Sequence, residues 1–119
     1  MSRLLAQMEE KVYRQLVDRV FARIDKAFEK VAPDLAESTL SQGTLIIVFR
    51  EKLQLILSPQ TPMRQIWAAF RDRAWHFSLE SDGAKDGDRW VDDRGQGIEL
   101  LRLVEELALA NAGVTVKIF

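Results

Sequence analysis

The spacing of apolar residues changes twice along this chain of 119 residues, and that change limits the fold more than any other feature. Over residues 5–31 apolar side chains recur every three or four positions, which predicts an α-helix that ends before Pro33. Over residues 37–92 the period is two, which predicts short strands. The helical period returns after Gly97 and ends near Gly113, a residue suited to a left-handed helix cap.

Short polar connections separate the predicted strands, so neighbouring strands should be antiparallel. The strands are expected at Glu37–Ser41, Thr44–Phe49, Leu53–Leu57, Arg64–Phe70, Trp75–Leu79 and Arg89–Asp92. The order helix, strands, helix predicts a single α+β domain over residues 1–119, a two-layer sandwich in which both helices cover one face of the sheet. The polar segment 81–88 should be a loop, and the tail Val114–Phe119 should pack back on the domain.

The other face of the sheet should carry apolar side chains that nothing covers. Alternate residues of a strand face opposite ways, so if Ile66 faces the core, Gln65 and Trp67 face outward. The same alternation turns Ile46, Val48 and Ile56 outward. A contiguous exposed apolar patch would mark a partner-binding surface, although the tail folding over Trp67 is the alternative.

Composition excludes several classes of function. The chain has no cysteine, which excludes disulfides, thiolate metal sites and cysteine nucleophiles. A formal charge of −1 predicts no strong attraction to nucleic acid or to a membrane surface. We find no long apolar run and no export signal, so we expect a cytoplasmic protein. With one histidine and no recognisable nucleophile motif, the sequence gives no support for hydrolysis, and we expect no enzyme activity.

Three strings in fixed order carry a family resemblance. They are Pro62-Met63-Arg64-Gln65-Ile66-Trp67, Trp75-His76-Phe77-Ser78-Leu79 and Arg89-Trp90-Val91-Asp92-Asp93-Arg94-Gly95, followed by the second helix. Together they resemble the bacterial branch of the frataxin family, over nearly the whole chain.

The resemblance implies a non-enzymatic, monomeric protein of iron–sulfur cluster assembly. It implies weak surface binding of iron and docking on a cysteine desulfurase and its scaffold protein, whose sulfur transfer such proteins modulate. Carried over by position, the metal-binding acidic ridge falls on Asp25, Glu29 and Glu37. The partner-binding sheet surface falls on Ser58, Gln65, Trp67 and His76.

The acidic ridge is thinner here than the family pattern implies. Positions where relatives often carry carboxylates are Lys26, Lys30, Leu35 and Thr39. Because hard cations need several anionic oxygens, interleaved lysines weaken the potential that would attract iron. Asp25 and Glu29 therefore suit either a carboxylate pair on a cation or plain solvation. An adaptor on the same fold that has lost iron binding is the alternative function, and iron oxidation, a third, would need more clustered carboxylates.

Overall fold

The computed structural model describes residues 8–81 and 88–118, and it confirms the predicted α+β fold. The elements run in the order α2 (Glu10–Phe28), β1 (Ala36–Ser41), β2 (Thr44–Phe49), β3 (Gln54–Gln60), β4 (Gln65–Phe70), β5 (Arg73–Ser81), β6 (Asp88–Asp92) and α3 (Leu100–Ala112). Two short 3-10 turns, η1 (Arg50–Lys52) and η2 (Thr61–Met63), join strands. The predicted loop falls largely on residues 82–87, outside the described residues.

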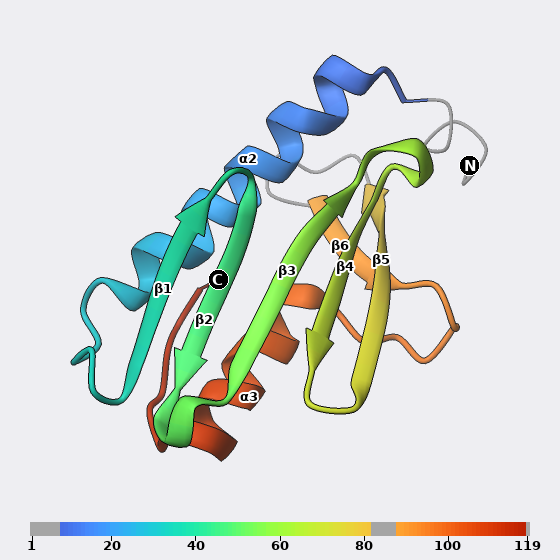
Figure 1. The fold of residues 1–119 in the computed structure, drawn as a ribbon. Coiled ribbons are helices and arrows are strands. Elements are labelled where there is room, and N and C mark those ends of the chain that lie inside the picture. Colours follow the sequence, from blue (N-terminus) through green and yellow to red (C-terminus); the bar gives the residue numbers. More distant parts are fainter. Residues whose placement is uncertain (1–7, 82–87, 119) are drawn as a thin grey trace.

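The six strands form one antiparallel sheet in which each strand pairs with its neighbours in sequence. Figure 1 shows α2 and α3 on the same side of this sheet, with the opposite side left open. In the described part of the chain, neither helix is long and apolar enough to cross a bilayer.

Strand alternation places the core between the sheet and the helices. Leu45, Ile47 and Phe49 of β2 are buried, and they alternate with half-buried residues that face the open side. The same pattern holds in β3, where Leu55 and Leu57 are buried. The tail also packs on this core as predicted, because Val116 and Ile118 are both buried.

The first helix docks through one apolar stripe. Its buried residues recur at the predicted three- and four-residue spacing, and they are Tyr13, Val17, Val20, Phe21, Ile24 and Phe28. The predicted stripe also included Val12, which is 42% exposed instead, and it left out Tyr13, Val17 and Phe21. Tyr13 is fully buried, and its hydroxyl donates a hydrogen bond of 2.5 Å to the main-chain carbonyl of Gln65. The helix is thereby tied to the first residue of β4.

The second helix begins later than Gly97. The helical residues start at Leu100, because the carboxylate of Glu99 accepts hydrogen bonds from the backbone N–H groups of Leu101 and Arg102. A side-chain acceptor at this position satisfies N–H groups that have no partner within the helix. The predicted end is confirmed: Gly113 has φ 68° and closes the helix in the left-handed conformation.

The β2–β3 turn has an unexpected backbone for its sequence. Glu51 and Lys52 both adopt positive φ, at 60° and 62°, values that usually select Asn or Gly. The turn is held by the Phe49 N–H, which donates to the Leu53 carbonyl at 2.7 Å. The strand pairing therefore imposes a left-handed conformation on two residues that disfavour it.

Strand β3 is longer than predicted and runs through Pro59 to Gln60. Its pairing with β2 ends at Leu57, so Pro59 has a strand partner only in β4, at Ile66. A proline lacks a backbone N–H and is tolerated where one side of a strand is unpaired. The extension brings the end of β3 beside the start of β4.

Candidate docking surface on the open sheet face

Three strands, and the turn after a fourth, contribute residues to one row across the open face of the sheet. Ser58 of β3 pairs with Trp67 of β4, which pairs with His76 of β5. The N–H of Asp93, just after β6, donates to the His76 carbonyl at 2.9 Å and extends the row. The predicted outward orientation of Trp67 is confirmed, because its neighbours Ile66 and Ala68 are the buried ones.

The apolar residues of this face were predicted to be exposed, and the structure shows them half-buried. Ile46, Val48, Ile56 and Trp67 all have intermediate exposure. Ile46 and Ile56 are direct cross-strand partners, and such partners shield one another because their side chains lie within contact distance. The surface is thus a packed apolar layer with one face open, not a set of protruding side chains.

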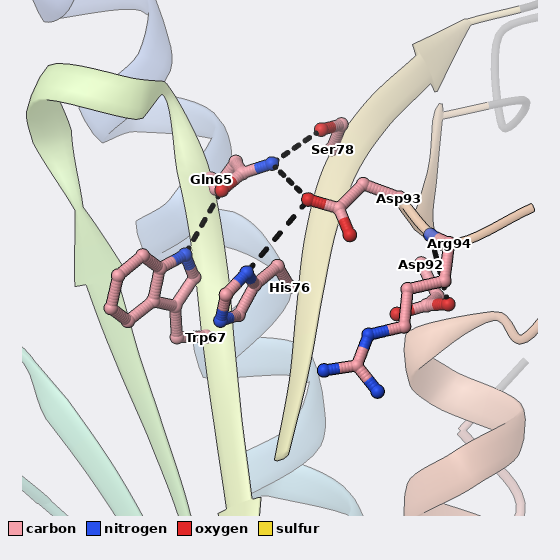
Figure 2. A network of polar contacts seen from close by, with 7 residues as sticks. All are labelled: Gln65, Trp67, His76, Ser78, Asp92, Asp93 and Arg94. Carbon is pink, nitrogen blue, oxygen red and sulfur yellow. Dashed lines mark hydrogen bonds and ion pairs between the residues drawn. The ribbon is translucent and has the colours of Figure 1, made fainter.

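The indole of Trp67 is stacked on the imidazole of His76. The ring centroids are 4.2 Å apart and the planes lie within 14° of parallel. Figure 2 shows the two rings side by side, with the polar residues of the network along one edge. One face of the indole is therefore covered by a neighbour in the same chain, and its orientation is fixed before any partner arrives.

The side-chain amide of Gln65 connects this aromatic pair to the next strands (Figure 2). Its Oε1 accepts a hydrogen bond of 2.9 Å from Trp67 Nε1. Its Nε2 donates to Ser78 Oγ and to Asp93 Oδ2, both at 3.0 Å. Gln65 is only 7% exposed, so its amide is used inside the protein and holds Trp67 in place.

Asp93 closes the network from the other side. Its Oδ2 lies 3.8 Å from His76 Nδ1, and the side chains of Asp93 and His76 are 39% and 36% exposed. Asp92 is not part of this surface, since it pairs with the core residue Phe77 and is itself buried. Its Oδ2 accepts a hydrogen bond of 3.1 Å from the Arg94 N–H, which shapes the turn after β6.

The network is anchored to the core below it. Because Tyr13 donates to the main-chain carbonyl of Gln65, the residue that orients Trp67 is held from both sides of the sheet. Burial raises the pKa of the Tyr13 hydroxyl above its ordinary value of 10.0, so the donor keeps its proton to a higher pH than a free tyrosine would.

Two residues of the network were not among the predicted site residues. Ser78 follows His76 by two positions and so shares its face, and Asp93 lies opposite His76 across β5 and β6. Strand alternation would have found Ser78. Ser58, which was predicted, lies on the row, but its hydroxyl has no hydrogen-bond partner within residues 8–81 and 88–118.

The predicted metal residues do not form a compact centre. Ser38 Oγ donates a hydrogen bond to Asp25 Oδ1, so one oxygen of that carboxylate joins α2 to β1. Glu29 is the exposed cap residue of α2, and Glu37 is exposed on β1. Across the described ranges, no three His, Asp or Glu side chains are grouped so that they could hold a metal ion. These residues do not fit a closed iron site, and iron binding there stays a prediction.

This geometry suits binding rather than bond-breaking chemistry. A fixed aromatic ring in an apolar layer, surrounded by half-exposed polar groups, has the composition of a protein interface centre. A side chain that is already ordered loses little entropy when a partner covers it.

Comparison with known proteins places the chain in a family. The Frataxin-like domain profile matches residues 6–113. The chain is 30% identical over 110 residues to the iron-sulfur cluster assembly protein CyaY of Aeromonas hydrophila, covering 92% of this chain and 98% of that protein. It is 29% identical over 106 residues to the same-named protein of Tolumonas auensis, covering 89% and 94%.

A solved structure supports the fold independently. Frataxin from Psychromonas ingrahamii superposes with a TM-score of 0.80 at 24% identity, covering 94% of this chain and 99% of that one. The family profile spans most of the chain and the relatives match over almost their full length. The chain belongs to the frataxin-like family.

Proposed function

We propose that this protein acts in iron–sulfur cluster assembly as a non-enzymatic regulator that docks on the cysteine desulfurase and scaffold complex through its open sheet face. The relatives that share almost the whole chain are named as iron-sulfur cluster assembly proteins, which supports the pathway. The docking surface is the row of Ser58, Trp67 and His76, together with the apolar layer beside it. A cytoplasmic location fits this proposal.

The single observation that carries the docking proposal is the fixed, half-buried Trp67. Stacking on His76 and the hydrogen bond to Gln65 hold the indole in one orientation on a face that neither helix covers. Aromatic residues at the centre of an interface contribute most of its binding energy when a partner excludes water from them. Gln65 acts in this proposal by orienting Trp67, since its own amide is already hydrogen-bonded.

The test is the affinity of the Trp67→Ala variant for a purified desulfurase and scaffold complex, measured by calorimetric titration. We expect at least about 30-fold weaker binding, the loss typical of a central aromatic. Leu109→Ala is the matched control, because Leu109 is 57% exposed on α3, away from the sheet face, and should leave affinity unchanged. Equal affinities for the original protein and the folded Trp67→Ala variant would refute the proposal.

A second candidate, an adaptor that works without iron, is favoured by the state of Asp25. That carboxylate accepts a hydrogen bond from Ser38, and Lys26 follows it on α2, with Lys30 in the turn after the helix. Titration of ferrous iron followed by NMR separates the candidates. Shifts confined to Asp25, Glu29 and Glu37 support the iron-binding regulator, whereas an unchanged spectrum at excess iron supports the adaptor.

A further inference from the structure

A basic groove lies on the helix side of the molecule, away from the docking surface. It has a volume of about 510 Å³ and runs between the second half of α2 and the C-terminal segment 114–118. Arg23 and Lys26 line it from α2, Lys30 lines it from the turn after α2, and Lys117 lines it from the segment. No carboxylate is among the described residues that line it. A chain with net charge −1 thus concentrates four cations at one place.

Three of these cations have no ion-pair partner among the residues that the structure describes. Across residues 8–81 and 88–118, no ion pair joins Lys26, Lys30 or Lys117 to a carboxylate. Lys26 lies in the last turn of α2 and Lys30 in the turn that follows the helix, so the groove gathers like charges that repel one another. Arg23 donates through Nε to the Ile118 carbonyl at 2.8 Å, which fixes its guanidinium at the groove. An anionic occupant would relieve this repulsion.

The groove is also partly apolar, which limits the kind of anion that fits. Val31, three residues past the end of α2, and the segment residues Val116 and Ile118 line it beside the cations. A small, strongly hydrated anion gains nothing from apolar walls, because its charge prefers water. A chain that alternates charged and apolar side chains satisfies both kinds of lining.

The spacing of the cations favours an elongated occupant. From Arg23 to the last helical residue, Phe28, α2 rises by roughly 7.5 Å, and Lys30 lies two residues beyond that end. Alternate side chains of an extended peptide are about 6.8 Å apart, so two or three carboxylates on such a peptide span the same length. A single phosphate would contact only part of the row.

The C-terminal segment offers main-chain partners for such a peptide. It continues from α3 without belonging to the sheet, as Figure 1 shows, and residues 114–118 have no strand assignment. In the described part of the chain, the backbone N–H and C=O groups of Thr115, Val116 and Lys117 make no hydrogen bond. Unpaired backbone groups of an extended segment are a template for adding a strand.

We propose that this groove binds an extended acidic segment of a partner protein, in which carboxylates alternate with apolar residues. The carboxylates pair with Lys26, Lys30 and Lys117, and the peptide backbone pairs with residues 115–117. The site is separate from the sheet face, so it does not depend on the docking role of Trp67.

The experiment titrates the isotope-labelled full chain with a capped peptide of sequence Val-Glu-Thr-Glu-Val-Glu and follows the amide shifts. We expect shifts concentrated in residues 23–31 and 114–118. Affinity should fall about 5- to 10-fold in the Lys26→Gln/Lys30→Gln variant, as expected for the loss of two exposed charge contacts. Lys11→Gln/Lys52→Gln is the matched control, since both lysines are exposed and lie outside the groove, and should bind like the original chain.

Two further probes separate the proposal from simpler binding. The peptide with lysine in place of each glutamate, and the acidic peptide N-methylated at alternate amides, should both bind at least about 10-fold more weakly. Inorganic phosphate should not compete. The proposal is overturned if phosphate displaces the peptide at equal concentration, if the groove variant binds like the control variant, or if the shifts map to the sheet face.

Discussion

Replacing Gln65 with leucine isolates the contribution of its side-chain amide to the docking surface. The substitution keeps most of the apolar volume and leaves the main-chain carbonyl that Tyr13 contacts. It removes two neutral hydrogen bonds, with Trp67 and Ser78, and one with the charged carboxylate of Asp93. At about 1 kcal/mol for each neutral bond and about 1.5 to 3 for the charged one, the full sum is roughly 3.5 to 5 kcal/mol.

Water reduces that sum. Asp93 is 39% exposed and Trp67 is half-buried, so both can bond to solvent once the amide is gone. We therefore expect the free energy of unfolding to fall by about 1.5 to 3 kcal/mol, measured by urea denaturation. The indole N–H resonance of Trp67 should also move toward the position of a solvated indole.

The matched control is Gln54→Leu. Gln54 is an exposed glutamine of β3 on the same face, and it makes no side-chain hydrogen bond in the described chain. Its substitution should change the free energy of unfolding by no more than about 0.5 kcal/mol. If both variants lose the same small amount and the indole resonance stays in place, the reasoning about Gln65 is refuted.

Three further predictions concern backbone conformation and ionisation. Lys52→Gly should raise the free energy of unfolding by about 0.5 kcal/mol in urea denaturation, because glycine removes the left-handed strain at φ 62° but adds unfolded-state entropy. Gly113→Ala should lower the free energy of unfolding by roughly 1 kcal/mol in the same assay, because alanine disfavours the left-handed backbone. A Cβ at this position meets nothing within 4 Å, so only the backbone can cause the loss, and an unchanged stability would contradict that reasoning. Burial raises the pKa of Tyr13 above 10.0, so its contribution to stability should be full below about pH 10 and lost as pH rises through the folded-state pKa. Tyr13 is the single tyrosine, so tyrosinate absorbance reports it alone, and ionisation at the pH of a free tyrosine in the folded protein would disprove this assignment.

The layers of the fold were predictable because each depends on a local period. The β-branched run Thr44–Phe49 is a strand with the predicted bounds, and the alternation in Gln65–Phe70 correctly placed Trp67 on the open face. The end of α3 was predictable from one glycine, Gly113, whose conformational freedom suits a left-handed cap. These features need no knowledge of distant contacts.

The features that were missed depend on contacts between distant residues. The burial of Gln65 follows from Tyr13 on one side and Asp93 on the other, 52 and 28 positions away. The alternation of a strand cannot predict that an outward-facing glutamine will be buried by such contacts. The positive φ of Glu51 is likewise imposed by strand pairing against local preference.

The candidate site was predictable as a surface but not as a network. Strand alternation and family resemblance together predicted Ser58, Trp67 and His76, and the strand register places these three residues in one row. The three acidic residues of the predicted metal site came from the resemblance alone. In the structure one of them, Asp25, accepts a hydrogen bond from Ser38. A sequence pattern shows which residue types are present, whereas their partners are fixed only when the helix packs on the sheet.

Cross-saturation NMR tests the central claim most directly. The labelled chain is bound to an unlabelled desulfurase and scaffold complex, and the signals that the partner attenuates are mapped. The account predicts attenuation on the open sheet face, at Ile46, Ile56, Trp67 and His76, with α3 unaffected. Attenuation confined to the helix layer, with the Trp67 indole signal unchanged in the complex, would contradict it.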